Sequence, residues 1–187
     1  LPWLNTWVEA LYSYSFPPNE STKDIGWEEY DSWLPSHFID AIPRNLIIKP
    51  DGKHVFIDLE WVEAHALPLK LVVYRGLSIT FNSITSVAKP ANKKLLDTEF
   101  LCESLMHTLG MEMTKLDHSR FMPIVDNLIR RAQGIEPLAH PPTKPYSSKQ
   151  LFVRHEEHSL SPTTELTLYW HCKDTSYNEN DTVKKKF

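Results

Sequence analysis

The chain has 187 residues, of which 41% are hydrophobic and 24% charged, an ordinary composition for a globular protein long enough to bury one good core. Its formal net charge of −4 gives no case for nucleic acid or an anionic membrane as a partner. No apolar run approaches the roughly 18 residues that span a bilayer, so no transmembrane segment is predicted. The two cysteines, Cys102 and Cys172, do not indicate a disulfide framework, and we expect a cytoplasmic protein.

The first part of the chain predicts one amphipathic helix, a loop and a β-hairpin. Apolar residues recur at the helical spacing i, i+3, i+4 and i+7 near the start: Leu4, Trp7, Val8 and Leu11. Pro17 ends this helix because proline removes a backbone donor, and residues 17–36 are expected to form a loop with a short helical piece. Two short buried strands are predicted at 46–48 and 55–57. They are joined by a turn at Pro50-Asp51-Gly52 and form the hairpin.

Three further helices are predicted after the hairpin. Pro68 suits the first turn of one helix, because its missing N–H would have no partner there. Asp97 and Asp117 are placed to cap two more helices, which Gly110 and Gly134 would end. Helices combined with a small hairpin predict an α+β fold.

A change of composition divides the chain near residue 135. Residues 135–149 carry four prolines, a density that forbids a helix and suits an extended linker. Beyond it, strand-like runs at 151–153 and 166–170 predict the start of a β-rich unit. The expected organisation is therefore a first unit at 1–134, a proline-rich linker at 135–149 and a partial β-rich unit at 150–187.

Three polar residues around the predicted hairpin have a spacing with a chemical use. Asp40 is followed five residues later by Asn45, and Asp58 lies thirteen residues beyond that. Because the hairpin folds the intervening residues back on themselves, Asn45 and Asp58 are expected to meet. Phosphoryl transfer needs a carboxylate that accepts the proton of the attacking hydroxyl, and oxygen ligands that hold magnesium. Asp40, Asn45 and Asp58 would supply these parts.

The same segment resembles a known family. Asp40-Ala41-Ile42-Pro43-Arg44-Asn45 and Phe56-Ile57-Asp58-Leu59-Glu60 look like the catalytic loop and metal-binding segment of kinase-like phosphotransferases of the aminoglycoside and choline kinase type. With Trp61, Leu67-Pro68-Leu69 and Tyr74-Arg75-Gly76, the segment is most similar to part of bacterial surface-polysaccharide biosynthesis proteins, in which a methyltransferase or glycosyltransferase is often joined to it. The likeness covers about residues 1 to 135 and is specific at 38–61.

The resemblance implies a role for each of the three residues. Asp40 matches the catalytic aspartate, and Asn45 and Asp58 match the metal ligands. The fold expected from it is a kinase-like large lobe, with helices around a small β-hairpin. Mg²⁺ and ATP are then possible cofactors of the full-length parent, a saccharide is a possible substrate, and the chain would be part of a transferase.

The sequence also departs from that family. Phe38 stands where the family usually has a histidine, and 39 residues before Asp40 are too few for a lobe that clasps ATP. We therefore expect an upstream domain of the same polypeptide, and neither activity nor bound cofactor in the isolated chain. Two alternatives stay open: a non-catalytic scaffold or interaction module beside a methyltransferase or glycosyltransferase, and a chance match in which Asp40 and Asn45 only cap turns.

Overall fold

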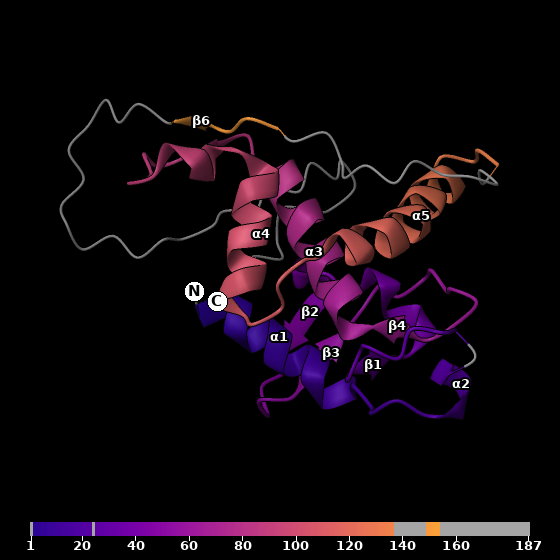
Figure 1. Cartoon of the computed structure of the whole chain (residues 1–187). Coiled ribbons are helices and arrows are strands. Elements are labelled where there is room, and N and C mark those ends of the chain that lie inside the picture. Colours follow the sequence, from indigo (N-terminus) through magenta and orange to yellow (C-terminus); the bar gives the residue numbers. More distant parts are fainter. Residues whose placement is uncertain (1, 24, 137–148, 154–187) are drawn as a thin grey trace. The chain divides into compact units, whose positions relative to one another are not determined.

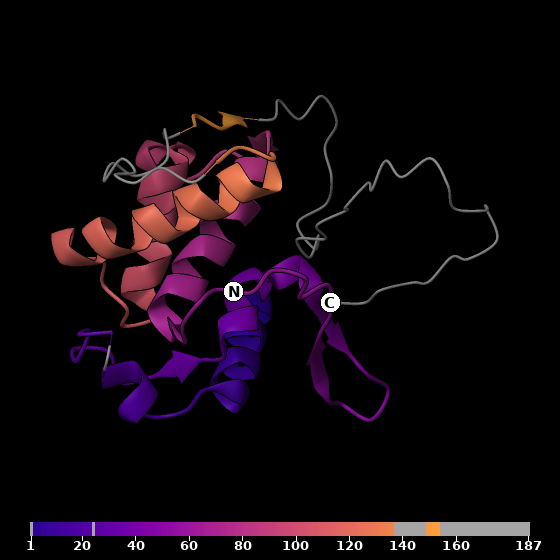
Figure 2. The same cartoon turned by 90° about the vertical axis from the view of Figure 1, so that its right-hand side faces the viewer.

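The computed structural model describes residues 2–23, 25–136 and 149–153 (Figures 1 and 2). All of them belong to the first of two units, Leu1–Arg154, whereas the second unit is His155–Phe187. Most of the predicted linker, and the predicted β-rich unit beyond residue 153, lie outside the described residues. The described part combines helices with small sheets, which confirms the predicted α+β class. Within it, no helix is both long enough and apolar enough to cross a membrane.

Helices dominate the described part of the chain. The α-helices are α1 (Pro2–Tyr14), α2 (Glu20–Lys23), α3 (Leu69–Ser83), α4 (Thr98–Thr108) and α5 (Lys115–Ala132). Short 3₁₀ turns are η1 (Ser36–Asp40), η2 (Pro43–Asn45) and η3 (Lys93–Leu96). The strands are β1 (Trp33–Leu34), β2 (Leu46–Ile48), β3 (His54–Phe56), β4 (Leu67–Pro68), β5 (Ser86–Val87) and β6 (Phe152–Val153). They pair as β1–β4, β2–β3 and β5–β6.

The predicted first helix and hairpin are both confirmed. Helix α1 buries the predicted apolar stripe, with Trp7 1% and Leu11 0% exposed. The hairpin strands β2 and β3 are antiparallel, with Leu46 opposite Phe56. The turn between them places Gly52 at φ +81°, a conformation that glycine adopts at no steric cost. The second strand begins one residue earlier than predicted, at His54.

Helix α3 is the centre of the core, as its position in Figure 1 indicates. It contacts α1, α4, α5 and both η1 and η2. Pro68 is its N-cap residue, and nearly every position from Leu69 to Phe81 is buried. A Cβ built on Gly76 would lie 2.5 Å from a ring carbon of Trp7, so this helix approaches α1 as closely as only glycine permits. The chain segment after α1 and before the hairpin is thus pressed against α3.

The helix ends at α4 and α5 follow the cap rules with one correction. Asp97 caps α4 as predicted, because its side chain accepts a hydrogen bond from the N–H of Phe100 at 2.9 Å. The prediction that Asp117 caps α5 is wrong: Thr114 is the N-cap, and its hydroxyl accepts from the N–H of Asp117 at 3.1 Å. The carboxylate of Asp117 in turn accepts a hydrogen bond from the N–H of Thr114 at 2.7 Å, which makes a capping box.

The start of the predicted β-rich unit packs within the first unit. The predicted strand at 151–153 is present as β6, and it pairs in parallel with β5, Phe152 opposite Ser86. Just before it, the side-chain amine of Lys149 donates to the backbone carbonyls of Asn82 and Ile84, at 3.2 and 3.0 Å. Residues 149–153 therefore extend the small sheet beside the end of α3.

Candidate functional site

The loop that carries Asp40 is held by side chains from three elements. Each donates to one of three consecutive backbone carbonyls: Trp7 Nε1 of α1 to Ala41 at 2.8 Å, Asn45 Nδ2 of η2 to Asp40 at 2.9 Å, and Arg75 Nη1 of α3 to Ile39 at 2.6 Å. The loop also closes on itself, since the N–H of Ile42 donates to the carbonyl of Asp40 at 2.8 Å. A short loop with this many bonds has one conformation, which is the condition for placing a functional side chain accurately.

The carboxylate of Asp40 forms a largely buried ion pair with Arg75. Arg75 Nη2 lies 2.9 Å from Asp40 Oδ1, and the two side chains are only 8% and 16% exposed. The other carboxylate oxygen, Oδ2, receives a longer contact from Asn45 Nδ2 at 3.4 Å. An ionised carboxylate has about four lone-pair sites, so these two contacts orient Asp40 without using all of them.

Asn45 is bound to Asp40 through its amide nitrogen. Its side chain is buried, and its amide nitrogen is directed at the backbone carbonyl of Asp40. The other polar atom of the amide group is an oxygen, which can only accept hydrogen bonds or bind a cation. Oxygen is the donor that magnesium prefers, so this arrangement fits the predicted ligand role.

Asp58 follows the residue that pairs with Asn45 and has an unusual backbone conformation. The N–H of Ile57 donates to the carbonyl of Asn45 at 2.9 Å, which continues the hairpin pairing one step beyond the β2–β3 register. Asp58 follows directly, is exposed, and has φ +55°, whereas the other positive-φ residues of the described part are glycines. Positive φ is unusual for a non-glycine residue, although aspartate and asparagine adopt it more readily than the others, and unusual conformations of this kind are concentrated at functional sites.

The structure therefore brings the three predicted residues to one region, by two kinds of link. Asn45 Nδ2 donates to the backbone carbonyl of Asp40. Asp58 is linked to Asn45 through the residue before it, because the N–H of Ile57 donates to the Asn45 carbonyl. Within the described residues no group of three His, Cys, Asp or Glu side chains could hold a metal alone. Asn45 and Asp58 are two oxygen donors, which suits magnesium that takes its remaining ligands from water and substrate phosphates.

Arg131 of α5 binds the segment that follows Asp58. Arg131 forms an ion pair with Glu63, and its guanidinium lies 5.9 Å from the ring centre of Trp61. The N–H of Glu63 also donates to the carbonyl of Ser36 at 3.3 Å. Burial raises the pKa of Glu63, and the charges of Arg131 and Arg75 offset this only in part. Two arginines thus contribute to the electrostatic environment of the segment that carries Asp58.

Sequence reasoning placed Trp7 in the buried stripe of the first helix and Arg75 in the motif Tyr74-Arg75-Gly76, but it gave neither of them, nor Glu63 and Arg131, a role in the site. Arg75 did give a signal, because it is a charged residue inside the apolar run from Leu71 to Leu77. A buried arginine needs an anionic or carbonyl partner, and that need pointed to an acidic loop elsewhere in the chain. Nothing in the local pattern identified which loop.

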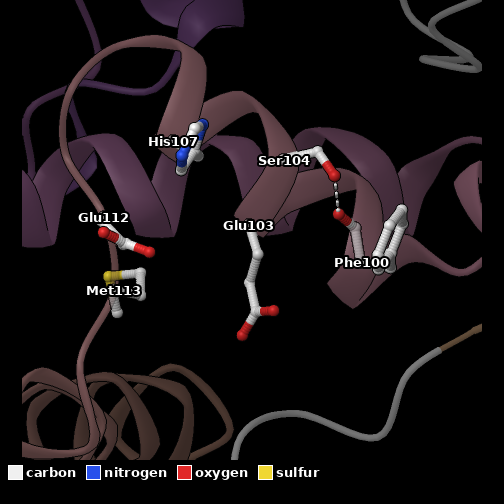
Figure 3. A pocket seen from close by; sticks show the side chains of 6 residues that line it. All are labelled: Phe100, Glu103, Ser104, His107, Glu112 and Met113. Atoms are coloured by element: carbon white, nitrogen blue, oxygen red, sulfur yellow. Dashed lines mark hydrogen bonds between the residues drawn. The ribbon is translucent and has the colours of Figure 1, made fainter.

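A separate groove lies on α4 and the turn after it (Figure 3). Six residues line it: Phe100, Glu103, Ser104, His107, Glu112 and Met113. The hydroxyl of Ser104 donates to the carbonyl of Phe100 at 2.7 Å, a bond internal to the helix. None of the predicted site residues belongs to this groove, so it is no part of the candidate phosphotransfer site.

Comparison with protein-family models, with curated proteins and with solved structures gives no match. The kinase-like resemblance and the roles of Asp40, Asn45 and Asp58 therefore stay predictions, now with a geometry attached to each residue.

Proposed function

We propose that the chain is a kinase-like large-lobe segment of a phosphotransferase-like protein that acts in bacterial surface-polysaccharide biosynthesis. The observation that carries the proposal is Asp58, held at positive φ one residue after Ile57, whose N–H donates to the carbonyl of Asn45. A strained residue at the position expected for a metal ligand is what a preorganised site requires. We propose further that the isolated chain is inactive, because the described residues contain no glycine-rich loop to hold a nucleotide.

In this proposal the site residues bind the metal, accept the proton or hold the loop. Asp40 accepts the proton of a sugar hydroxyl while that oxygen forms a bond to the transferred phosphorus, and the bond to the nucleoside diphosphate leaving group breaks. Asn45 and Asp58 would hold magnesium, which when bound neutralises charge on the phosphates. Trp7, Asn45 and Arg75 keep the loop of Asp40 in place through the bonds described above.

Activity of the full-length parent, in which an upstream domain would supply the nucleotide, tests the proposal. Asp40→Ala and Asp58→Ala should each abolish phosphoryl transfer from ATP to a saccharide acceptor while the variants remain folded. A parent that keeps its transfer activity with both substitutions contradicts the catalytic roles. Exposed Asp51, in the hairpin turn, gives the matched control, and Asp51→Ala should leave the activity unchanged.

A second candidate function, a non-catalytic scaffold or interaction module beside a methyltransferase or glycosyltransferase, is favoured by two observations. Arg75 engages one carboxylate oxygen of Asp40 in an ion pair, and Phe38, at the position where the family usually has histidine, is 3% exposed and packs against Tyr14 and Phe56. The scaffold predicts that both aspartate substitutions leave the parent's methyl or glycosyl transfer unchanged. It also predicts that removing residues 1–134 impairs that transfer.

A further inference from the structure

The motif Tyr74-Arg75-Gly76 has no part in the chemistry proposed above, yet its arginine reaches the catalytic loop. Arg75 is buried in α3, at 7% exposure, and uses two nitrogens of its guanidinium on two consecutive residues. Nη1 donates to the backbone carbonyl of Ile39 at 2.6 Å, and Nη2 lies 2.9 Å from Asp40 Oδ1. The planar guanidinium of Arg75 thus binds both the backbone carbonyl before Asp40 and the carboxylate of Asp40 itself.

The other two donors of the loop act on the backbone. Trp7 donates to the carbonyl of Ala41, and Asn45 donates to the carbonyl of Asp40. The contact of Asn45 with the Asp40 carboxylate is longer, at 3.4 Å. These bonds fix where the loop runs but leave the side-chain torsions of Asp40 weakly restrained. The short contact to Arg75 is what sets the direction of the carboxylate.

The neighbouring glycine makes this reach possible. A Cβ at Gly76 would lie 2.5 Å from the ring of Trp7 and 3.2 Å from Pro43 Cδ, so a side chain there would push α3 away from α1 and from η2. Arg75 is held close to the loop by this contact. A lysine at the same place would offer one ammonium group and could not reproduce the planar fork.

We infer that Arg75 is the positioning residue of Asp40, with Gly76 setting the approach of its helix to the loop. The inference rests on the proposed function for the meaning of Asp40, but the geometry it asserts is testable without any activity. It deepens that function by naming the group that directs the proton acceptor toward its substrate.

Nuclear magnetic resonance of the full chain, with ¹³C-labelled aspartate carboxyls, tests the inference. Arg75→Lys retains the positive charge but loses the fork, so the carboxyl resonance of Asp40 should move, and the amides of Ala41 and Ile42 should exchange roughly tenfold faster, the equivalent of one lost charge-assisted bond. Trp7→Phe removes the donor to Ala41 together with the ring carbons that lie against Gly76, but leaves both Arg75 contacts intact. It should speed the same amide exchange and leave the Asp40 carboxyl resonance in place.

Arg44→Lys is the matched control, because Arg44 is exposed and lies next to Asn45. The inference is overturned if the Asp40 carboxyl resonance moves no further in Arg75→Lys than in Arg44→Lys. It is also overturned if that resonance moves as far in Trp7→Phe as in Arg75→Lys. Either result would reduce Arg75 to one of several structural contacts of the loop.

A second measurement separates this inference from the proposed function. Mn²⁺ with a nucleotide, added to the wild-type parent, should broaden the signals of Asn45 and Asp58. Absence of broadening contradicts the metal site while the Asp40 carboxyl test still decides the role of Arg75. If the parent is active, Arg75→Lys should lower kcat and leave KM nearly unchanged, since a misdirected base weakens the chemical step and not substrate binding.

Discussion

Tyr30 and Asp117, 87 residues apart in the sequence, are joined by a hydrogen bond of 2.6 Å from the tyrosine hydroxyl to Asp117 Oδ1. The other carboxylate oxygen forms an ion pair of 2.6 Å with Lys70 of α3 and accepts from the N–H and hydroxyl of Thr114. One buried carboxylate thereby links the loop after α2, the start of α3 and the first turn of α5. This linkage stabilises the frame on which the candidate site is built.

Removing the tyrosine hydroxyl should destabilise the protein. Tyr30→Phe leaves the ring packing against Trp33 and Phe121 but deletes a hydrogen bond to a charged group, worth roughly 1.5–3 kcal/mol. Urea denaturation measures the loss. Tyr12→Phe is the matched control, since Tyr12 is 48% exposed, and it should cost nothing measurable. Equal stability of the two variants would show that the buried bond contributes nothing.

The protein should lose stability in acid partly through Asp117. Burial alone would raise the pKa of Asp117, but hydrogen bonds from Lys70, Tyr30 and Thr114 outweigh it and lower the pKa. Because the folded-state pKa is below that of the unfolded chain, this contribution is present above the unfolded pKa and is lost as pH falls through the folded value. Denaturant midpoints measured from pH 7 down to pH 3 should therefore fall more steeply in the wild type than in Asp117→Asn.

Glu63 acts in the opposite direction over a neighbouring pH range. Its raised pKa means that the folded state binds the proton more tightly than the unfolded state does, so this contribution favours folding at lower pH and is lost as pH rises through the folded value. In the test of Asp117, the denaturant midpoint is plotted against pH for the wild type and for Asp117→Asn. Equal slopes of the two plots would contradict the role assigned to Asp117.

Gly76→Ala should destabilise the protein although alanine is the better helix former. The exchange normally gains about 1 kcal/mol inside a helix, but the added Cβ would lie 2.5 Å from the ring of Trp7. Overpacking of this kind costs typically 1–3 kcal/mol. Thermal unfolding of Gly76→Ala, Trp7→Phe and the double variant gives the coupling, and the double variant should be less destabilised than the sum. A neutral Gly76→Ala would disprove the close approach of α1 and α3.

The positive φ of Asp58 predicts that glycine is tolerated there and alanine is not. Asp58→Gly relieves the backbone strain and should leave stability unchanged or slightly raised, whereas Asp58→Ala should lower it by about 1 kcal/mol. Denaturant unfolding of the pair measures the difference. If alanine and glycine give the same stability, Asp58 is not strained, and the observation that carries the proposed function fails.

Local signals in the sequence predicted most of the elements. The spacing of Leu4 and Trp7 indicated α1, and Pro50 with Gly52 indicated the hairpin turn, because these patterns act over a few residues. Long-range pairings left no such signal. The strand pair β1–β4 joins Trp33 to Pro68, and no local pattern at either residue identifies the other. The same reason hid the Arg75 partner of Asp40. The N-cap of α5 was misassigned for another reason: Thr114 and Asp117 have the local spacing of a capping box, and only the second of the two residues was considered.

The measurement that most directly tests the magnesium role of Asn45 and Asp58 is the melting temperature of the full-length parent with magnesium and nucleotide. A ligand that binds only the folded protein, at about one hundred times its Kd, adds roughly 2.7 kcal/mol of stability. The proposal predicts a raised melting temperature in the wild type and little or none in Asp58→Asn, because asparagine tolerates positive φ and removes the charged ligand. No shift in the wild type at saturating magnesium and nucleotide would contradict the phosphotransferase mechanism.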